Sequence, residues 1–191
     1  PRNFLSVLHR GAAPKISAGS SGRLQLANWL ASKDNAVRYV KLGRTGLDVS
    51  RLCLGCMSYG VPERGTHPWS LGEEQSRPFI KRALELGINF FDTANIYSDG
   101  TSEEIVGRWL AGRPRESLFI ATKIAGPGGG WFQAPVRHGR TALDRHSIAR
   151  AVDGSLKRLG TDYIDLYQTH WPDPALPIEE TLEGLARVID A

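Results

Sequence analysis

Hydrophobic positions between residues 39 and 191 follow two different patterns. Some apolar runs are short and continuous, as in residues 88–91, which is typical of strands buried on both faces. Longer segments such as residues 145–159 place apolar residues three or four positions apart, which is typical of helices packed along one side. The patterns alternate, and they predict strands over residues 51–54, 88–91, 118–122 and 163–169, and helices over residues 73–86, from about 102 to 111, over 145–159 and from 177 onward.

Residues that start or stop helices flank these segments. Gly87, Gly112 and Gly160 each follow a predicted helix, where glycine favours the left-handed conformation that ends a helix. Thr101 and Glu104 stand in the T-x-x-E pattern of a capping box, which predicts that the Thr101 side chain caps the second helix. Apolar stripes identify the expected buried faces, with Phe79, Ile80, Ala83 and Leu84 in the first helix and Ile178, Leu182, Leu185 and Ile189 in the last.

A strand followed by a helix thus occurs four times, which predicts a parallel sheet covered by helices and an α/β fold. Two short strands precede these units, at residues 39–42 and 47–49, and Gly43 and Gly46 flank the turn between them. We expect these strands to form a hairpin, because glycine supplies the positive φ that a tight reversal requires.

The first 35 residues differ in composition from the rest. They are rich in Ser, Gly and Ala, and they contain five basic residues but only Asp34 as an acidic one. The net charge of +4 therefore lies in this segment, and residues 36–191 are neutral. We expect residues 1–35 to be a disordered basic leader or a non-native extension, with organellar targeting as an alternative. Because the chain begins with Pro1 rather than Met, we expect its natural start to differ.

Composition argues against several functional classes. With 41% hydrophobic and 23% charged residues the chain is typical of globular proteins, and no run approaches the roughly 18 to 20 apolar residues of a membrane span. A neutral folded part argues against nucleic-acid binding, which needs clustered Lys and Arg. Cys53 and Cys56 form a C-x-x-C pair, but no second pair completes a zinc site, so we expect no metal. Alternation makes Cys53 a buried strand residue, and we expect reduced thiols in the cytoplasm, with a functional dithiol as the alternative.

Three polar residues mark the ends of predicted strands. Asp92, Lys123 and His170 each directly follow one, and Tyr97 lies five residues beyond Asp92. Because the C-terminal strand ends of a β/α barrel meet around one mouth, we expect these side chains to converge there. A solvated strand end is the simpler interpretation of any one of them alone, but the combination favours a site.

Together the four side chains are suited to proton transfer. A tyrosine hydroxyl ordinarily has a pKa near 10, which is too high for efficient proton donation and recovery at neutral pH. An ammonium group at hydrogen-bonding distance stabilises the tyrosine anion, and a carboxylate orients that ammonium and offsets the cost of burying it. We expect Asp92 and Lys123 to pair beside Tyr97, with a neutral His170 holding a carbonyl oxygen next to the Tyr97 hydroxyl.

The residues around these positions resemble the motifs of the aldo-keto reductase superfamily. They are FDTANIY at residues 91–97, ATK at 121–123 and QTHWP at 168–172, while GCM at 55–57 is similar to the first strand-end loop of bacterial-type members. The resemblance runs from about Arg38 to Ala191. It implies the family's (β/α)8 TIM barrel, of which residues 36–191 would supply the first four β/α units and the opening hairpin, that is, its N-terminal half.

The resemblance also implies an activity, the NADPH-dependent reduction of an aldehyde or ketone to an alcohol by hydride transfer. Carried over residue by residue, Tyr97 would be the general acid and Lys123 would stabilise the anion that Tyr97 leaves. Asp92 would pair with Lys123, and His170 would orient the substrate.

Few residues remain to contact the cofactor in this half of the barrel. The resemblance leaves Gly55, Cys56, Met57 and Asp92 as candidates for contact with NADPH. Trp171 is similar to a pocket-lining residue, although ordinary packing at a strand end explains it equally well.

The resemblance further implies that the second half of the barrel is missing. The residues that hold the nicotinamide and the 2′-phosphate of NADPH would be missing with it, as would most loops that select the substrate. An open half-barrel exposes two sheet edges and an apolar face, which predicts self-association. We therefore expect little or no reductase activity from the isolated chain.

The loop from Gly126 to Arg140 is rich in glycine. We expect it either to contribute to substrate specificity or to be a mobile surface loop.

Two other functions have to be weighed against a reductase. The same superfamily includes the β subunits of voltage-gated potassium channels, so a non-catalytic binding subunit is the main alternative, although the complete set of four catalytic residue types disfavours it. A barrel aldolase would use Lys123 to form a Schiff base, which requires a neutral amine. A neighbouring Asp92 favours the charged ammonium instead, so an aldolase is disfavoured as well.

Overall fold

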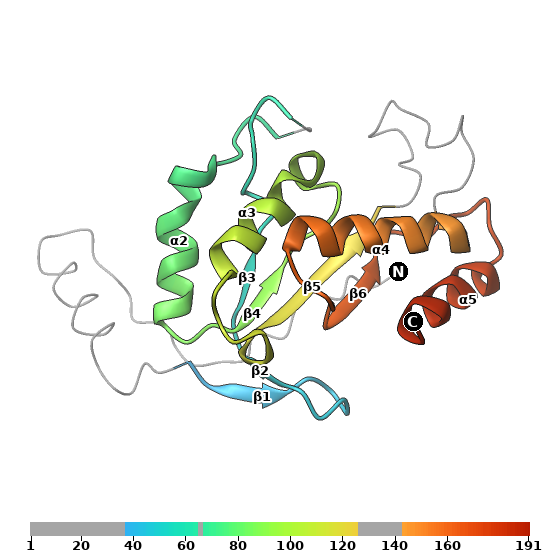
Figure 1. The fold of residues 1–191 in the computed structure, drawn as a ribbon, viewed down its shortest axis with the longest axis horizontal. Helices are drawn as coiled ribbons and strands as arrows, with labels where there is room; N and C mark the ends of the chain where they lie inside the picture. The colour runs from blue at the N-terminus through green and yellow to red at the C-terminus, as the bar shows by residue number, and fades with distance from the viewer. Residues whose placement is uncertain (1–36, 65–66, 126–142) are drawn as a thin grey trace, which may run out of the picture. The chain divides into compact units, whose positions relative to one another are not determined.

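The computed structural model describes residues 37–64, 67–125 and 143–191, which belong to one compact unit (Figure 1). At its centre lies a parallel sheet with the strand order β3-β4-β5-β6. Its strands are β3 (Cys53–Gly55), β4 (Phe90–Asp92), β5 (Phe119–Ile124) and β6 (Leu166–Thr169). The predictions for residues 1–35 and for the loop from Gly126 to Arg140 fall outside the described residues.

Helices connect each strand to the next. They are α2 (Glu73–Glu85), α3 (Thr101–Leu110) and α4 (Arg145–Leu159), followed by α5 (Ile178–Ile189) at the end of the chain. Figure 1 shows α2, α3 and α4 against one face of the sheet, and two short 3₁₀ segments, η2 (Tyr97–Gly100) and η3 (Arg115–Ser117), lie in the connections. The predicted α/β class is confirmed. Within the described residues, no helix combines the length and apolar character that crossing a membrane requires.

The outer face of the sheet, which faces the helices, carries most of the hydrophobic core. Phe91 and Ile120 alternate with inward-facing neighbours, and their side chains are buried among residues of α2 and α3. The largest cluster consists of Cys56, Tyr59, Ile80, Ala83, Phe91, Ile105, Val106, Leu110, Leu118, Ile120 and Leu159. A second cluster places Ile124 against Leu143 and Ile148, with Leu185 of α5 packed at its side.

The inner face of the sheet is the one opposite the helices. The predicted hairpin covers it near the amino ends of the strands. Strands β1 (Tyr39–Lys41) and β2 (Asp48–Ser50) pair antiparallel, and Val49 packs with Phe119 and Ala121 of β5. Asn89 fixes the hairpin beneath the sheet, because its side chain accepts a hydrogen bond from the Ser50 backbone N–H and donates one to the Asp48 carbonyl. The hairpin thus closes the end of the sheet at which the strands begin.

The predicted bounds and caps of individual elements agree with the structure only in part. The helix at residues 145–159 has the predicted bounds, whereas β6 begins at Leu166, three residues later than predicted. The capping box was wrong: Gly100 occupies the N-cap position in a left-handed conformation, Thr101 is the first helical residue, and no side chain caps α3. The hydroxyl of Thr101 is buried without a hydrogen-bond partner.

Several side chains expected to be buried are exposed. Cys53 is exposed, which corrects the prediction of a buried strand residue, because the inner face above the hairpin is not covered by other described elements. Phe79 of α2 is 54% exposed, and the stripe of α5 is buried only around Leu185, while Ile178, Leu182 and Ile189 are exposed. An apolar stripe identifies the face that a helix offers to a neighbour, but here the described residues do not supply that neighbour.

Candidate active site

The strand ends bring the predicted catalytic residues together on the inner face. Asp92 is the last residue of β4 and pairs in register with Gly55 on one side and Ala121 on the other. Lys123 lies two residues beyond Ala121 in β5, so its side chain points to the same face as that of Asp92. The polar residues stand at the carboxyl ends of these strands, opposite the hairpin.

Lys123 is the centre of the site. Its ammonium donates to Asp92 Oδ1 at 2.5 Å, to the Thr93 carbonyl at 2.8 Å and to the Tyr97 hydroxyl at 3.4 Å. Its side chain is only 15% exposed, and that of Asp92 is 29% exposed. An ammonium group has three hydrogens, so the carboxylate and the carbonyl hold two of them and leave the third directed at the phenol.

His170 and Trp171 complete the site from the end of β6. The His170 ring lies 5.6 Å from the Tyr97 ring between centroids, edge to face, and 4.6 Å from the Trp171 ring. The backbone N–H of His170 donates to the Ile124 carbonyl, which fixes the end of β6 against β5. Burial lowers the pKa of His170 below its usual 6.5, with Lys123 acting in the same direction. The direction of this shift favours the neutral imidazole, the form that the sequence analysis expects.

Residues that were not singled out from the sequence support this arrangement. The Ser102 hydroxyl donates to the Cys56 carbonyl at 2.7 Å and lies 2.9 Å from the Thr93 hydroxyl, and all three residues are fully buried. Asn95 accepts a hydrogen bond from the Ala125 backbone N–H. Thr93 acts on Lys123 through its carbonyl, which every residue has, so its residue type gave no signal of this role.

The residues of the predicted cofactor loop, 55–57, differ in how far they are buried. A Cβ atom built on Gly55 would meet no heavy atom within 4 Å, so open space adjoins the backbone beside Asp92. Met57 is 39% exposed. Cys56 is buried in the outer core, where its thiol donates to the Leu54 carbonyl and burial raises its pKa well above the usual range. Gly55 and Met57 are therefore the solvent-exposed residues of this loop.

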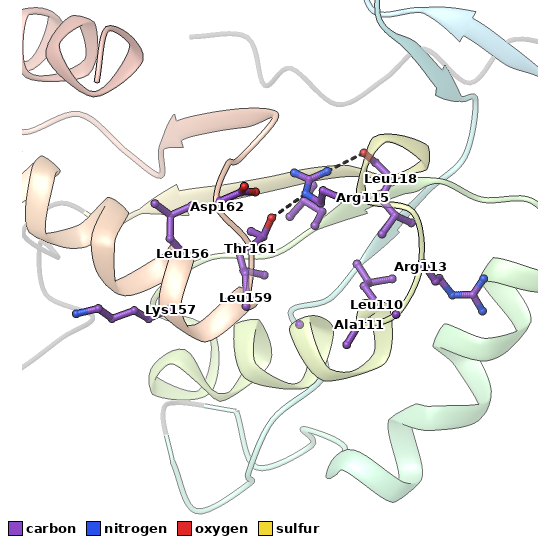
Figure 2. A pocket seen from close by; sticks show the side chains of 14 residues that line it. Leu110, Ala111, Arg113, Arg115, Leu118, Leu156, Lys157, Leu159, Thr161 and Asp162 are labelled. Carbon is purple, nitrogen blue, oxygen red and sulfur yellow. Dashed lines mark hydrogen bonds between the residues drawn. The ribbon is translucent and has the colours of Figure 1, made fainter.

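A pocket of about 560 Å³ lies at the opposite end of the sheet, between α3 and α4 (Figure 2). Arg115 reaches across it and donates to Thr161 Oγ1, the Leu118 carbonyl and Asp165 Oδ2 (the first two are drawn in Figure 2). Its guanidinium also stacks on the Tyr163 ring at 3.8 Å. This arginine ties the start of β5 to the segment before β6, and the pocket is not lined by Asp92, Tyr97, Lys123 or His170.

Comparison with known proteins assigns the chain to a family. The model of the Aldo/keto reductase family matches residues 51–191. The chain belongs to the aldo/keto reductase family. Its four-stranded sheet is accordingly part of a (β/α)8 barrel, and the chain is an N-terminal-type portion of that fold.

Individual relatives show how much of the family fold the chain spans. It is 42% identical to versiconal hemiacetal acetate reductase of Aspergillus parasiticus, covering 81% of this chain and 48% of that protein. It is likewise 42% identical to aldo-keto reductase YhdN of Bacillus subtilis, covering 81% of this chain and 44% of that protein. The holo form of aldo-keto reductase AKR11C1 from Bacillus halodurans is 37% identical with a TM-score of 0.63, over 81% of this chain and 47% of that structure. The chain thus spans about half the length of these relatives, and their names do not favour the alternative of a binding subunit.

Proposed function

We propose that this chain supplies the proton-transfer half of an NADPH-dependent reductase of aldehydes or ketones. The observation that carries the proposal is the position of the Lys123 ammonium, which hydrogen-bonds to both Asp92 Oδ1 and the Tyr97 hydroxyl. Family membership and the names of the relatives support a carbonyl oxidoreductase.

The proposed mechanism assigns Tyr97 the role of general acid, which gives its hydroxyl proton to the carbonyl oxygen of the substrate. The Lys123 ammonium, held by Asp92 and Thr93, stabilises the resulting phenolate. A neutral His170 donates a ring N–H to the same carbonyl oxygen, so two donors converge where negative charge develops. Trp171, whose ring is tilted by 50° against that of His170, is our candidate for the wall of the substrate pocket.

The described residues fit one wall of a nicotinamide site. Open space adjoins Gly55 next to Asp92, and Met57 is exposed two residues later, so these three residues would contact NADPH. Cys56 would attach the loop to β4 and α3, because its backbone N–H donates to the Asp92 carbonyl and its own carbonyl accepts from Ser102. NADPH supplies the hydride when it is bound. A single wall contacts one side of the cofactor only, which is why we expect the isolated chain to bind NADPH weakly.

Oxidation of NADPH by 4-nitrobenzaldehyde, followed at 340 nm, tests the proposal in two arms. The first uses the purified 191-residue chain, for which we expect no turnover above that of its Tyr97→Phe variant. The second joins residues 36–191 to the second half of the barrel of aldo-keto reductase YhdN, which supplies the other walls of the barrel. We expect turnover in that chimaera, and a loss of roughly 10²- to 10⁴-fold with Tyr97→Phe, the usual contribution of a general acid.

Tyr163→Phe is the matched control for the loss of a phenol hydroxyl. Tyr163 is exposed at the other end of the sheet, so its substitution should leave turnover in the chimaera unchanged. Equal activity of the chimaera with and without the Tyr97 hydroxyl would refute the proposed acid. Turnover by the isolated chain above its Tyr97→Phe background would refute the expectation that the chain alone is inactive.

We further propose that the isolated chain self-associates. Strands β3 and β6 are the edges of the sheet, and Ile178, Leu182 and Ile189 of α5 are exposed. Light scattering should show masses above 21.0 kDa that rise with concentration, whereas a constant monomer mass would contradict this. Both cysteines are free thiols, in keeping with the cytoplasmic setting we propose, and organellar targeting by residues 1–35 stays the alternative.

A further inference from the structure

The residues directly after Tyr97 adopt a backbone conformation that L-amino acids rarely take. Ser98 has φ 48° and ψ 42°, and Asp99 has φ 55° and ψ 43°, so two consecutive non-glycine residues are left-handed before Gly100 at φ 88°. Such strained residues persist only where the surroundings hold them, and they cluster at functional sites. The conformation therefore calls for a contact that fixes this turn.

The Ser98 side chain provides that contact. It is only 5% exposed, and its hydroxyl accepts a hydrogen bond from the Val61 backbone N–H at 2.8 Å. Its own proton can be donated to the Val61 carbonyl at 2.8 Å or to the Arg64 carbonyl at 3.1 Å. Ser98 thus bonds to both backbone groups of a residue 37 positions earlier in the chain.

The loop that receives Ser98 is shaped for this contact. A Cβ atom built on Gly60 would lie 2.1 Å from the Ser98 Cβ, so only glycine permits the approach. Leu71 also holds this loop, because the Gly60 N–H donates to the Leu71 carbonyl and the Leu71 N–H donates to the Ser58 carbonyl. Ser98 is therefore attached to a well-supported piece of backbone.

Tyr97 depends on this attachment. Its hydroxyl lies 3.4 Å from the Lys123 ammonium, which is long for a hydrogen bond and leaves the phenol weakly held by its own contacts. Its backbone N–H is bonded only within the same loop, to the Ala94 carbonyl at 3.2 Å. A fixed point on the next residue would set the direction in which the phenol leaves the backbone.

We propose that Ser98 is a positioning residue that directs the Tyr97 phenol toward Lys123 and His170 by tying its segment to the backbone at Gly60 and Val61. The inference rests on the proposed function only in naming Tyr97 as the general acid. The tie itself is a property of the folded chain, so it can be tested without turnover.

Nuclear magnetic resonance on the full 191-residue chain provides two readouts. The chain has five tyrosines and five histidines, so selective ring labelling gives few signals, and Tyr97→Phe and His170→Gln assign the two that matter. The first readout is the nuclear Overhauser effect between the Tyr97 and His170 rings, whose centroids are 5.6 Å apart. The second is hydrogen exchange at the Val61 amide, which Ser98 protects.

Ser98→Ala removes the hydroxyl and keeps the strained backbone. We expect loss of the Tyr97–His170 effect and at least tenfold faster exchange at Val61, with the Leu71 amide unchanged. Asp99→Ala is the matched control, because it alters the neighbouring left-handed residue, whose side chain is exposed. It should leave both readouts as they are.

Ser98→Gly removes the hydroxyl and also relieves the strain of the left-handed backbone, so it tests the proposal if Ser98→Ala fails to fold. Wild-type readouts in a folded Ser98→Ala or Ser98→Gly variant would overturn the proposal, as would an equal change in Asp99→Ala. Unfolding of both Ser98 variants would also overturn it, because the residue would then serve the fold as a whole. The chimaera could be inactive while the Ser98 variants of the 191-residue chain still change the Tyr97–His170 effect and the Val61 exchange. That result would count against the reductase function and not against the role of Ser98.

Discussion

Replacing Glu103 by Gln should destabilise the fold strongly. Glu103 in α3 is fully buried, with Oε1 accepting from Thr122 Oγ1 and Oε2 from Arg158 Nε, each at 2.6 Å. It thereby joins α3 to β5 and to α4 directly behind the strand residue that precedes Lys123. Gln has the same shape, so the substitution removes the negative charge while preserving the volume.

The expected loss follows from how far the partners are buried. Removing one member of a buried ion pair leaves an uncompensated charge and costs about 3–5 kcal/mol. The Arg158 side chain is 29% exposed, so water offsets part of that cost and the lower end applies, about 3 kcal/mol. With a slope of roughly 1–3 kcal/mol per molar urea, the unfolding midpoint should fall by at least about 1 M.

An exposed pair in the same chain is the matched control. Glu73 pairs with Arg108 at 2.8 Å, but their side chains are 37% and 50% exposed, so Glu73→Gln should cost less than about 1 kcal/mol. Urea unfolding followed by circular dichroism measures both variants at pH 7. Equal losses in the two variants, or a loss below about 1 kcal/mol for Glu103→Gln, would refute the view that burial decides the contribution of this pair.

Two further changes follow from the structure. Gly107→Ala should cost about 1–3 kcal/mol in urea unfolding, because its Cβ would lie 2.5 Å from the Leu159 carbonyl oxygen. The Cβ of Gly154→Ala would come no closer than 3.1 Å to the Arg158 side chain, so this helix substitution should change the free energy of unfolding by less than about 1 kcal/mol; equal effects would refute the role of backbone contact. Burial lowers the pKa of His170 below that of the unfolded chain, so the unfolded chain binds the proton first as the pH falls through 6.5. The free energy of unfolding should therefore drop more between pH 7.5 and 5.5 in the wild type than in His170→Gln, and parallel pH profiles would contradict this.

The convergence of the site could be predicted because its residues end strands. Asp92, Lys123 and His170 stand at the carboxyl ends of β4, β5 and β6, and parallel strands bring those ends to one edge whatever the loops do. Helix α4 was predictable for a different reason, since its apolar spacing ends at Gly160, which is left-handed at φ 65°. Both features depend on local sequence and on the geometry of the elements.

Features that depend on distant contacts could not be predicted. Thr101 has the right neighbours for a cap, but the left-handed turn from Ser98 to Gly100 places Gly100 at the N-cap position. That turn is fixed by a loop 37 residues away, so the T-x-x-E pattern carries no sign of it. Cys53 was predicted wrongly for a similar reason, because alternation along a strand does not say which face is covered.

The contacts that build the proposed acid lie almost entirely within the first three strand–helix units. Lys123, Asp92 and Thr93 hold one another through β4 and β5, and Ser98 is tied to the loop after β3, all at the carboxyl ends of the strands. The contact expected with a nicotinamide ring is different, since Gly55 adjoins open space on an inner face that, among the described elements, only the hairpin covers in part. We therefore expect the isolated chain to keep its proton-transfer geometry while it lacks a firm hold on the hydride donor, so the ring contact between Tyr97 and His170 should be observable even where turnover is absent.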